Sequence, residues 1–296
     1  MGTGTGTDPT QTFPRKAGAQ ARTSRYFRGA GNFVLTAIAL SPSRASDFKT
    51  CPQLFKYRAI DRIAEPEDPA SARGTLVHLV LEKLLGCDPS ERSRDNIENI
   101  IEVAWESLRE EAEQQGMVFS KEQEEIWLIE VKSLIDNYFA IEDPSLITAH
   151  ELEWWVEHDD GNLFLRGIID RVEVDQNEDW ILSDYKTGRS PSETYALGAF
   201  FGLKFYALVC WRAFGKMPAK LRLFHLREPE VLTLIPTEQM LEGVERQLSA
   251  IASAIRKAVE KQDFRPRPGY ACAWCPHQAI CPAFVATQTD AAVLTA

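Results

Sequence analysis

The sequence lacks any apolar run of 18 residues and any signal-peptide pattern, so we expect a soluble, cytoplasmic protein. Cysteine is scarce, and six cysteines in 296 residues are too few for a disulfide scaffold. No internal repeat is present. The chain also lacks a net positive charge: its formal net charge is −10. This balance argues against a broad, nonspecific polycationic surface, but it is compatible with a local basic groove.

What is present, 44% apolar and 26% charged residues, is typical of a globular protein with a large core. Residues 1–35 are rich in Gly, Thr, Arg and Pro and predict a disordered tail, and we expect a flexible tail at 286–296. Between them we expect a single domain, 36–285. Helical spacing predicts a helical region at 43–142, and strand alternation followed by further helices predicts an α/β core at 150–262.

Four cysteines stand out by their spacing. Cys272, Cys275 and Cys281 form C-x2-C-x5-C within residues 264–284, and Cys51 lies far earlier in the chain. Four thiolates suit either a zinc ion or an iron–sulfur cluster, and the spacing does not choose between them. Buried thiols or two disulfides are the alternatives. The remaining two cysteines lie in apolar helical surroundings and are expected to be inert: Cys87 and Cys210.

A predicted β-hairpin carries two carboxylates and a lysine. If its turn is centred on residue 177, Val174 faces Trp180 and Asp170 faces Asp184. Opposed carboxylates repel each other unless a cation lies between them, and a divalent metal with oxygen ligands meets that need. Lys186 follows Asp184 by two residues and so shares its face of the strand. The alternative is a surface carboxylate pair with a lysine salt bridge.

Other residues near this hairpin have two interpretations each. His78 shares a helix face with Gly74, which favours a close approach of that helix, yet a lone helical histidine is usually structural. Glu153 on the preceding strand is either an additional acid of the site or a residue at the edge of the core. A further alternative is that Arg166 or Arg171 neutralises the aspartates.

In order and combination, five segments resemble the PD-(D/E)XK nuclease superfamily, in particular its RecB-type exonuclease branch. They are SPSRASDFKTCPQLFKYR, GTLVH, GIIDRVE, DYKTG and CAWCPHQAICP, and they extend from Ser41 to Phe284. The resemblance implies an α/β fold. Its PD-(D/E)XK restriction-endonuclease-like core would be a mixed central sheet flanked by helices, with an N-terminal helical region and a C-terminal cysteine clip.

The resemblance also implies roles for individual residues. Asp170 and Asp184 would bind Mg²⁺ or Mn²⁺ together with the Tyr185 carbonyl, His78 would be a ligand or a close neighbour, and Lys186 would be the catalytic lysine. In the iron–sulfur members of the branch, an upstream cysteine and a C-x2-C-x5-C motif hold a 4Fe–4S cluster. The matching residues here are Cys51, Cys272, Cys275 and Cys281.

The chain departs from this branch at one position. The branch has Gln-x3-Tyr on the helix after the lysine strand, whereas here Tyr206 is preceded by Gly202 at the glutamine position, with Lys204 nearby as an alternative DNA contact. Arg265 and Arg267 are further candidates for DNA binding. Basic residues expected to line a groove are Arg166, Arg171, Lys186, Arg189, Lys204, Arg265 and Arg267.

These observations predict a metal-dependent DNA nuclease, an exonuclease acting on single-stranded or end-containing DNA in repair, recombination or CRISPR-type processing. The resemblance implies a helicase or another repair or CRISPR protein as partner, and no membrane. The alternatives are a non-catalytic DNA-binding or scaffold subunit of a helicase–nuclease complex and a nuclease whose cysteine clip holds zinc.

Overall fold

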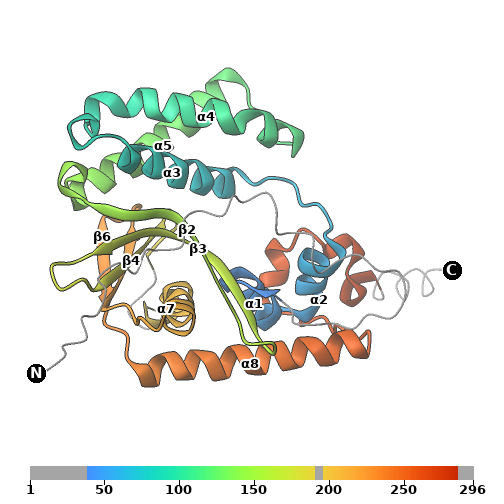
Figure 1. Ribbon diagram of the computed structural model, residues 1–296. Coiled ribbons are helices and arrows are strands. Elements are labelled where there is room, and N and C mark those ends of the chain that lie inside the picture. The colour runs from blue at the N-terminus through green and yellow to red at the C-terminus, as the bar shows by residue number, and fades with distance from the viewer. Residues whose placement is uncertain (1–38, 191–195, 286–296) are drawn as a thin grey trace, which may run out of the picture. The chain divides into compact units, whose positions relative to one another are not determined.

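A mixed six-stranded sheet organises the computed structural model, which describes residues 39–190 and 196–285 (Figure 1). The tails expected at 1–35 and 286–296 lie outside the described residues. The strand order is β1-β3-β4-β5-β6, with β2 paired to β3. β1–β3 and β4–β5 are parallel and the other pairs antiparallel. The strands are β1 Ala39–Leu40, β2 Ala149–Asp159, β3 Phe164–Val174, β4 Trp180–Lys186, β5 Lys220–His225 and β6 Glu230–Leu234.

Helices cover both faces of this sheet, which bears out the predicted α/β class. In Figure 1, α3, α4 and α5 lie on one side of the sheet, and α7 and α8 lie on the other. The α-helices are α1 Pro42–Thr50, α2 Pro52–Phe55, α3 Pro69–Gly86, α4 Ile97–Gln114, α5 Lys121–Ile141, α6 Ala196–Ala199, α7 Phe201–Phe214 and α8 Glu238–Glu260. None of the helices in the described part of the chain combines the length and apolar character that crossing a membrane requires.

Local sequence explains where the main helices begin and which face they bury. Helix α5 starts at a capping box, in which the Ser120 and Gln123 side chains each accept a hydrogen bond from the other residue's backbone amide. Its inward residues pack with those of α3 and α4 into one apolar cluster that reaches the sheet through Tyr185 and Phe224. The helical layer is therefore attached directly to the strand that carries Asp184.

The predicted hairpin register is confirmed. Val174 pairs with Trp180, and the pairing continues to Arg171 opposite Ser183. Strand β2 occupies one edge of β3 over most of its length, whereas β1 and β4 share the other edge at its two ends. On this second edge, the part of β3 between residues 165 and 171 pairs with neither β1 nor β4. Asp170 lies at the point where β3 and β4 separate.

The segment around Cys51 consists of short helices. Ser41 caps α1, and its side chain accepts the amide of Arg44 at 3.2 Å. Cys51 has extended backbone angles between α1 and α2, and a π-helix, Lys56–Asp61, follows. Two prolines at helix starts, Pro42 and Pro52, divide the segment into short helices. Cys51 lies at the junction of α1 and α2 and is half-buried.

Candidate functional site

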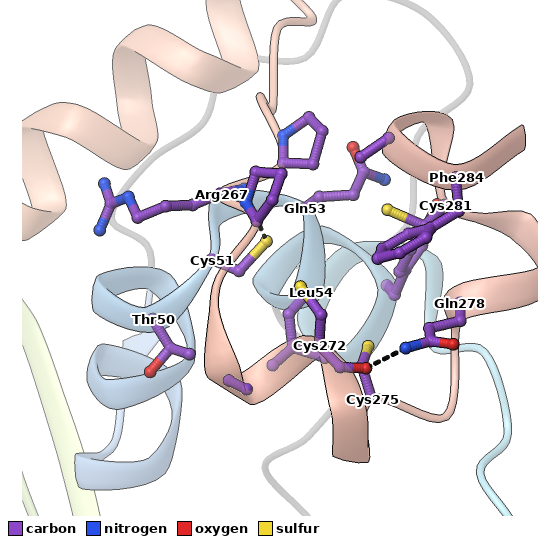
Figure 2. Close-up of a pocket in the computed structure, with 15 residues that line it drawn as sticks. Thr50, Cys51, Gln53, Leu54, Arg267, Cys272, Cys275, Gln278, Cys281 and Phe284 are labelled. Atoms are coloured by element: carbon purple, nitrogen blue, oxygen red, sulfur yellow. Dashed lines mark hydrogen bonds between the residues drawn. The ribbon is translucent and has the colours of Figure 1, made fainter. Parts of the chain in front are cut away.

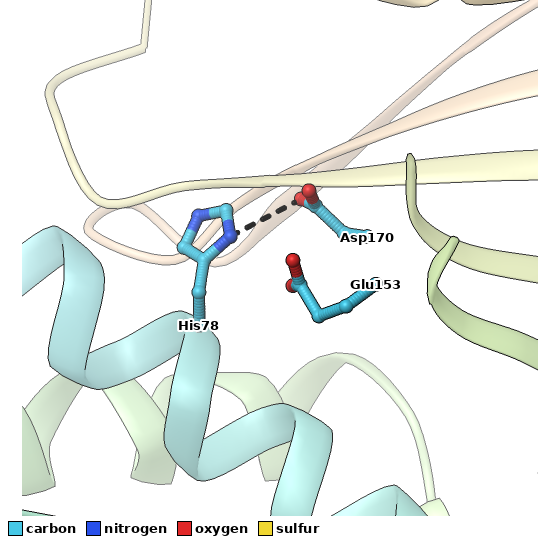
Figure 3. Close-up of side chains that lie close together, drawn as sticks. All are labelled: His78, Glu153 and Asp170. Atoms are coloured by element: carbon cyan, nitrogen blue, oxygen red, sulfur yellow. Dashed lines mark ion pairs between the residues drawn. The ribbon is translucent and has the colours of Figure 1, made fainter. Parts of the chain in front are cut away.

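Three side chains from three elements meet at the separation of β3 and β4 (Figure 3). His78 comes from α3, Glu153 from β2 and Asp170 from β3, and one ligand atom of each lies within 4.8 Å of the others. Among the residues that the structure describes, this is the group of three His, Cys, Asp or Glu side chains that meets this spacing. The spacing suits a single bound cation.

Hydrogen bonds to the backbone of β4 hold the histidine and the aspartate in place. The Tyr185 amide donates to Asp170 Oδ2 at 2.8 Å, and the Tyr185 carbonyl lies 3.0 Å from His78 Nε2. Because a carbonyl only accepts, Nε2 carries the proton, and Nδ1 faces Asp170 Oδ2 at 3.4 Å. In the neutral histidine this leaves the Nδ1 lone pair for a metal, the arrangement typical of ligand histidines.

Asp184 and Lys186 contribute a second carboxylate and an ammonium from β4. Lys186 Nζ lies 2.6 Å from Asp184 Oδ2, so the two side chains share a face as strand alternation predicts. Asp184 is buried, while the Lys186 side chain is 45% exposed. The lysine therefore connects a buried carboxylate to the surface, where a substrate could approach. We call His78, Glu153, Asp170 and Asp184 the acidic cluster.

The electrostatics of the acidic cluster favour a bound cation. Burial, followed by the charge of Asp170, raises the pKa of Asp184 to about 6 and that of Glu153 to about 7. Burial opposes protonation of His78, but its hydrogen bond to Asp170 and the surrounding carboxylates outweigh burial and raise its pKa to about 9. Without a metal, bound protons neutralise part of the negative charge of these carboxylates. The residues present thus fit a divalent cation with oxygen and imidazole ligands.

Glu153 belongs to the acidic cluster, although sequence left its role open. Its φ of 45° lies in the left-handed region, which is uncommon for a non-glycine residue. Such a conformation costs of order 1–3 kcal/mol and persists where surrounding contacts hold it. The distortion turns a strand residue toward Asp170 and His78, and no pattern of alternation would have revealed it.

The candidate DNA-contact residues do not all gather at the acidic cluster. Tyr206 of α7 does, since burial and then the charges of Asp184, Asp170 and Glu153 raise its hydroxyl pKa. Its ring packs where a Cβ on Gly167 would lie 2.4 Å away. The other candidates lie elsewhere: Lys204 close to Lys49, Arg265 exposed and 2.9 Å from Asp263, and Arg267 at the cysteines.

One of the basic residues predicted to line a groove is buried instead. Arg171 is completely buried and bonds to Glu142 and Glu173, the second at 3.1 Å. Glu173 also pairs with Arg222. Arg171 therefore cannot contact DNA, and it does not neutralise Asp170 by direct pairing. We call Arg171, Arg222, Glu142 and Glu173 the paired cluster.

The four predicted cysteines line one pocket, although they come from both ends of the domain (Figure 2). The Arg267 amide donates to Cys51 Sγ at 3.3 Å and the Gly269 amide to Cys272 Sγ at 3.4 Å. Nearby, the Tyr57 hydroxyl donates to the Ile280 carbonyl at 2.9 Å and ties the same two segments together. Cys87 and Cys210 are not part of this pocket.

The spacing of the thiols bears on the size of the group they would hold. Zn–S bonds of about 2.3 Å place the sulfurs of a tetrahedral zinc site roughly 3.8 Å apart. Within the described residues, no three of the cysteine sulfurs lie within 4.8 Å of one another. Backbone amides directed at thiol sulfur are also suited to thiolate ligands. The four thiols therefore line one pocket without the close spacing of a formed zinc site.

Comparison with known proteins identifies the fold family. A model of the PD-(D/E)XK nuclease superfamily matches residues 39–282, so the chain belongs to this superfamily. The match contains the acidic cluster, Lys186 and all four pocket cysteines.

Among solved structures, the chain is similar to a protein from Eubacterium rectale named "Putative exonuclease". The two are 12% identical with a TM-score of 0.56, over 81% of this chain and 87% of that one. SSO0001 is 14% identical over 86% of this chain and 89% of that one, with a TM-score of 0.39, below the level that indicates a shared fold. No curated protein matches the chain in sequence.

Proposed function

We propose that the protein is a Mg²⁺- or Mn²⁺-dependent deoxyribonuclease, specifically an exonuclease that acts on single-stranded or end-containing DNA. The observation that carries the proposal is the convergence of His78, Glu153 and Asp170 within 4.8 Å. Asp184 and its lysine partner complete the set of groups that phosphodiester hydrolysis requires. The superfamily supports a nuclease, and the name of the Eubacterium rectale protein is in keeping with an exonuclease.

The residues of the acidic cluster would have different roles, which follow from their positions. Asp170, Asp184 and His78 Nδ1 would hold the cation, with Glu153 as an additional acid and the Tyr185 carbonyl within reach of the His78 ring. Bound Mg²⁺ or Mn²⁺ supplies Lewis acidity, which makes water a better nucleophile and stabilises charge on phosphate. The Lys186 ammonium orients the attacking water and stabilises negative charge that develops on the phosphate oxygens.

Site-directed variants test this proposal. Asp184→Asn and Lys186→Ala should each lower the rate of digestion of end-labelled DNA by roughly 100- to 1000-fold, the usual cost of removing one transition-state stabilising group. Asp179→Asn, in the hairpin turn, is the matched control and should digest DNA normally. Wild-type rates in both site variants with Mg²⁺ or Mn²⁺ would exclude this assignment.

We further propose that Cys51, Cys272, Cys275 and Cys281 hold a 4Fe–4S cluster with a structural role, as in the RecB-type branch. Support comes from the shared pocket and the amides directed at two sulfurs. The cluster would join segments far apart in sequence. By analogy with long disulfide loops, that constraint contributes about 4–5 kcal/mol.

Metal analysis of anaerobically purified protein tests the cluster. The wild type should be brown and contain iron, and each of the four Cys→Ala variants should be colourless and poorly soluble. Cys87→Ala and Cys210→Ala are the matched controls and should keep their iron. Stoichiometric zinc without iron would instead establish the zinc-containing clip.

The proposed biological setting is DNA repair, recombination or CRISPR-type processing together with a helicase or a related partner. The competing proposal is a scaffold subunit that binds DNA without cutting it. The intact carboxylates and lysine favour the enzyme, because a scaffold has no need for a buried, mutually repelling acidic cluster. Digestion of DNA labelled at either end separates the two functions and reports the polarity of digestion.

A further inference from the structure

An exposed apolar pair lies on the hairpin beside the acidic cluster. Trp155 of β2 and Ile168 of β3 are direct cross-strand partners, and they are 51% and 41% exposed. The adjacent pair, Trp154 and Ile169, is buried against the core. Successive strand residues point to opposite faces, so a buried pair next to an exposed pair is expected. Alternation does not account for the large apolar side chains, a tryptophan and an isoleucine, at the exposed positions.

The position of this pair connects it to the chemistry. Trp155 is two residues from Glu153, and Ile168 is two residues from Asp170. A strand advances about 3.3 Å per residue, so the indole begins roughly 7 Å from the acidic cluster along the hairpin. The exposed pair therefore lies within two residues of the acidic cluster on both strands of the hairpin.

Positive charge gathers around the same part of the hairpin. The Arg166 guanidinium lies 5.9 Å from the centre of the Trp155 ring. Arg44 of α1 is anchored by its bond to the Ala39 carbonyl at 3.0 Å. Burial and then the charges of Arg166 and Arg62 lower the pKa of Arg44, so both arginines lie near enough to repel its charge. Arg44 and Arg166 are therefore the arginines near Trp155 that could contact an anion.

A carboxylate also lies at this place. Glu157 is opposite Arg166 in the strand pairing and lies 3.4 Å from the Trp155 indole nitrogen. That bond fixes one edge of the ring, and the residue as a whole is 51% exposed. The result is an oriented aromatic surface next to arginines, in a protein whose overall charge is −10.

We propose that Trp155 and Ile168 form a stacking platform for an unpaired base next to the scissile phosphate, with Arg166 and Arg44 contacting phosphates of the same strand. The inference rests on the proposed nuclease function and narrows its substrate to DNA that is single-stranded at the site of cutting. Aromatic side chains stack on any base, and arginines follow the backbone of a single strand. Bases within a duplex are already stacked on one another and cannot offer a face to Trp155.

Binding measurements with metal chelated, so that no DNA is cut, form the first test. Trp155→Ala should bind a single-stranded oligonucleotide roughly 5- to 100-fold more weakly, the effect of losing one stacked base, and Trp155→Phe should recover most of the affinity. Trp211→Ala is the matched control, because Arg212 lies over the Trp211 ring at 4.1 Å on helix α7. Arg166→Gln should reduce the slope of affinity against salt by about one phosphate contact.

An abasic-site scan supplies a readout that a merely structural tryptophan would not change. Digestion by the wild type should slow when the missing base occupies one position beside the cut, and Trp155→Ala should lose this sensitivity. Equal affinity of wild type and Trp155→Ala, or a scan without a sensitive position, would overturn the platform even if DNA is digested normally. Trp155-dependent binding without any digestion would support the platform and overturn the nuclease. A wild type that neither binds nor digests DNA would overturn both.

Discussion

Two consecutive residues of β3, Asp170 and Arg171, enter two charged clusters of opposite character. Arg171 joins the paired cluster, in which two arginines meet two glutamates and every charge has a protein partner. Asp170 joins the acidic cluster, in which three carboxylates share one lysine and one histidine. The comparison teaches that burial of charge has two uses here. In the first cluster the charges pair with one another within the sheet, whereas the second has an excess of negative charge that a cation would balance.

The surroundings of the two clusters also differ. The paired cluster lies among the rings of Tyr185 and Phe224, 5.7 and 5.0 Å from the Arg171 guanidinium, and Tyr138 also contacts Arg171. The acidic cluster opens to the surface through Lys186 and His78. Tyr185 connects the two, because its ring packs on one and its backbone bonds to the other.

The largest expected effect is the loss of Arg171. Arg171→Leu would leave the partly buried Glu142 without its arginine and Glu173 with Arg222 alone, and breaking a buried charge pair in this way costs about 3–5 kcal/mol of unfolding free energy. Urea denaturation measures the loss. Arg246→Leu is the control, since that arginine is exposed on α8 and pairs weakly. An Arg171→Leu protein as stable as the wild type would show that the paired cluster does not support the fold.

Asp170→Asn should instead lower activity and leave stability intact. Digestion of DNA should fall by roughly 100- to 1000-fold, which corresponds to about 2.7–4 kcal/mol of transition-state stabilisation. The unfolding free energy of the metal-free protein should stay the same or rise, because one of three repelling carboxylates becomes neutral. Measuring both quantities on one preparation sharpens the comparison. A variant that is destabilised yet active in its folded fraction would place Asp170 with the structural residues.

The smallest expected effect is a pH-dependent increase in the stability of the fold when metal binds. The raised pKa values of Asp184, about 6 against 3.8, and Glu153, about 7 against 4.5, mean that the metal-free folded state binds more protons than the unfolded state. His78, about 9 against 6.5, acts in the same sense. Stability without metal therefore falls as pH rises from about 4 to 9. A divalent cation needs deprotonated ligands, so its stabilisation grows over the same range.

Thermal unfolding with and without Mn²⁺ at pH 6 and pH 8 measures this effect. The gain in Tm should be larger at pH 8, by roughly 2–4 °C for each kcal/mol of difference. In Asp184→Asn the dependence should shrink, because one of the titrating carboxyls is gone. A metal-induced gain that is the same at both pH values would indicate that these groups are not the ligands.

Much of the site could be predicted because it rests on local rules. A short turn sets the register of the β3–β4 hairpin, and the structure confirms Val174 opposite Trp180. Alternation then places Asp184 and Lys186 on one face, where the structure has them 2.6 Å apart. The resemblance to the PD-(D/E)XK superfamily added the expectation that His78 lies close to these strands, and its ring does contact Asp170 and Tyr185.

What escaped prediction depends on tertiary contacts. Arg171 has the composition of a groove residue, but the fold buries it completely because Glu142, at the end of α5, reaches it from a distant part of the chain. Glu153 enters the acidic cluster only through its left-handed backbone. Neither property has a signal in spacing or composition, since both depend on which elements pack against β3.

The sequence by itself determined the order of the elements, the register of the hairpin and the types of residue that could bind metal, because turn length, alternation and side-chain chemistry act over a few residues. Tertiary structure decided the rest. It alone placed Asp170 in the acidic cluster and buried Arg171 among paired charges, brought Cys51 to the other three cysteines, and left Trp155 exposed on β2. The physical reason is that burial, charge pairing and exposure are properties of neighbours, and most neighbours here are distant in the chain.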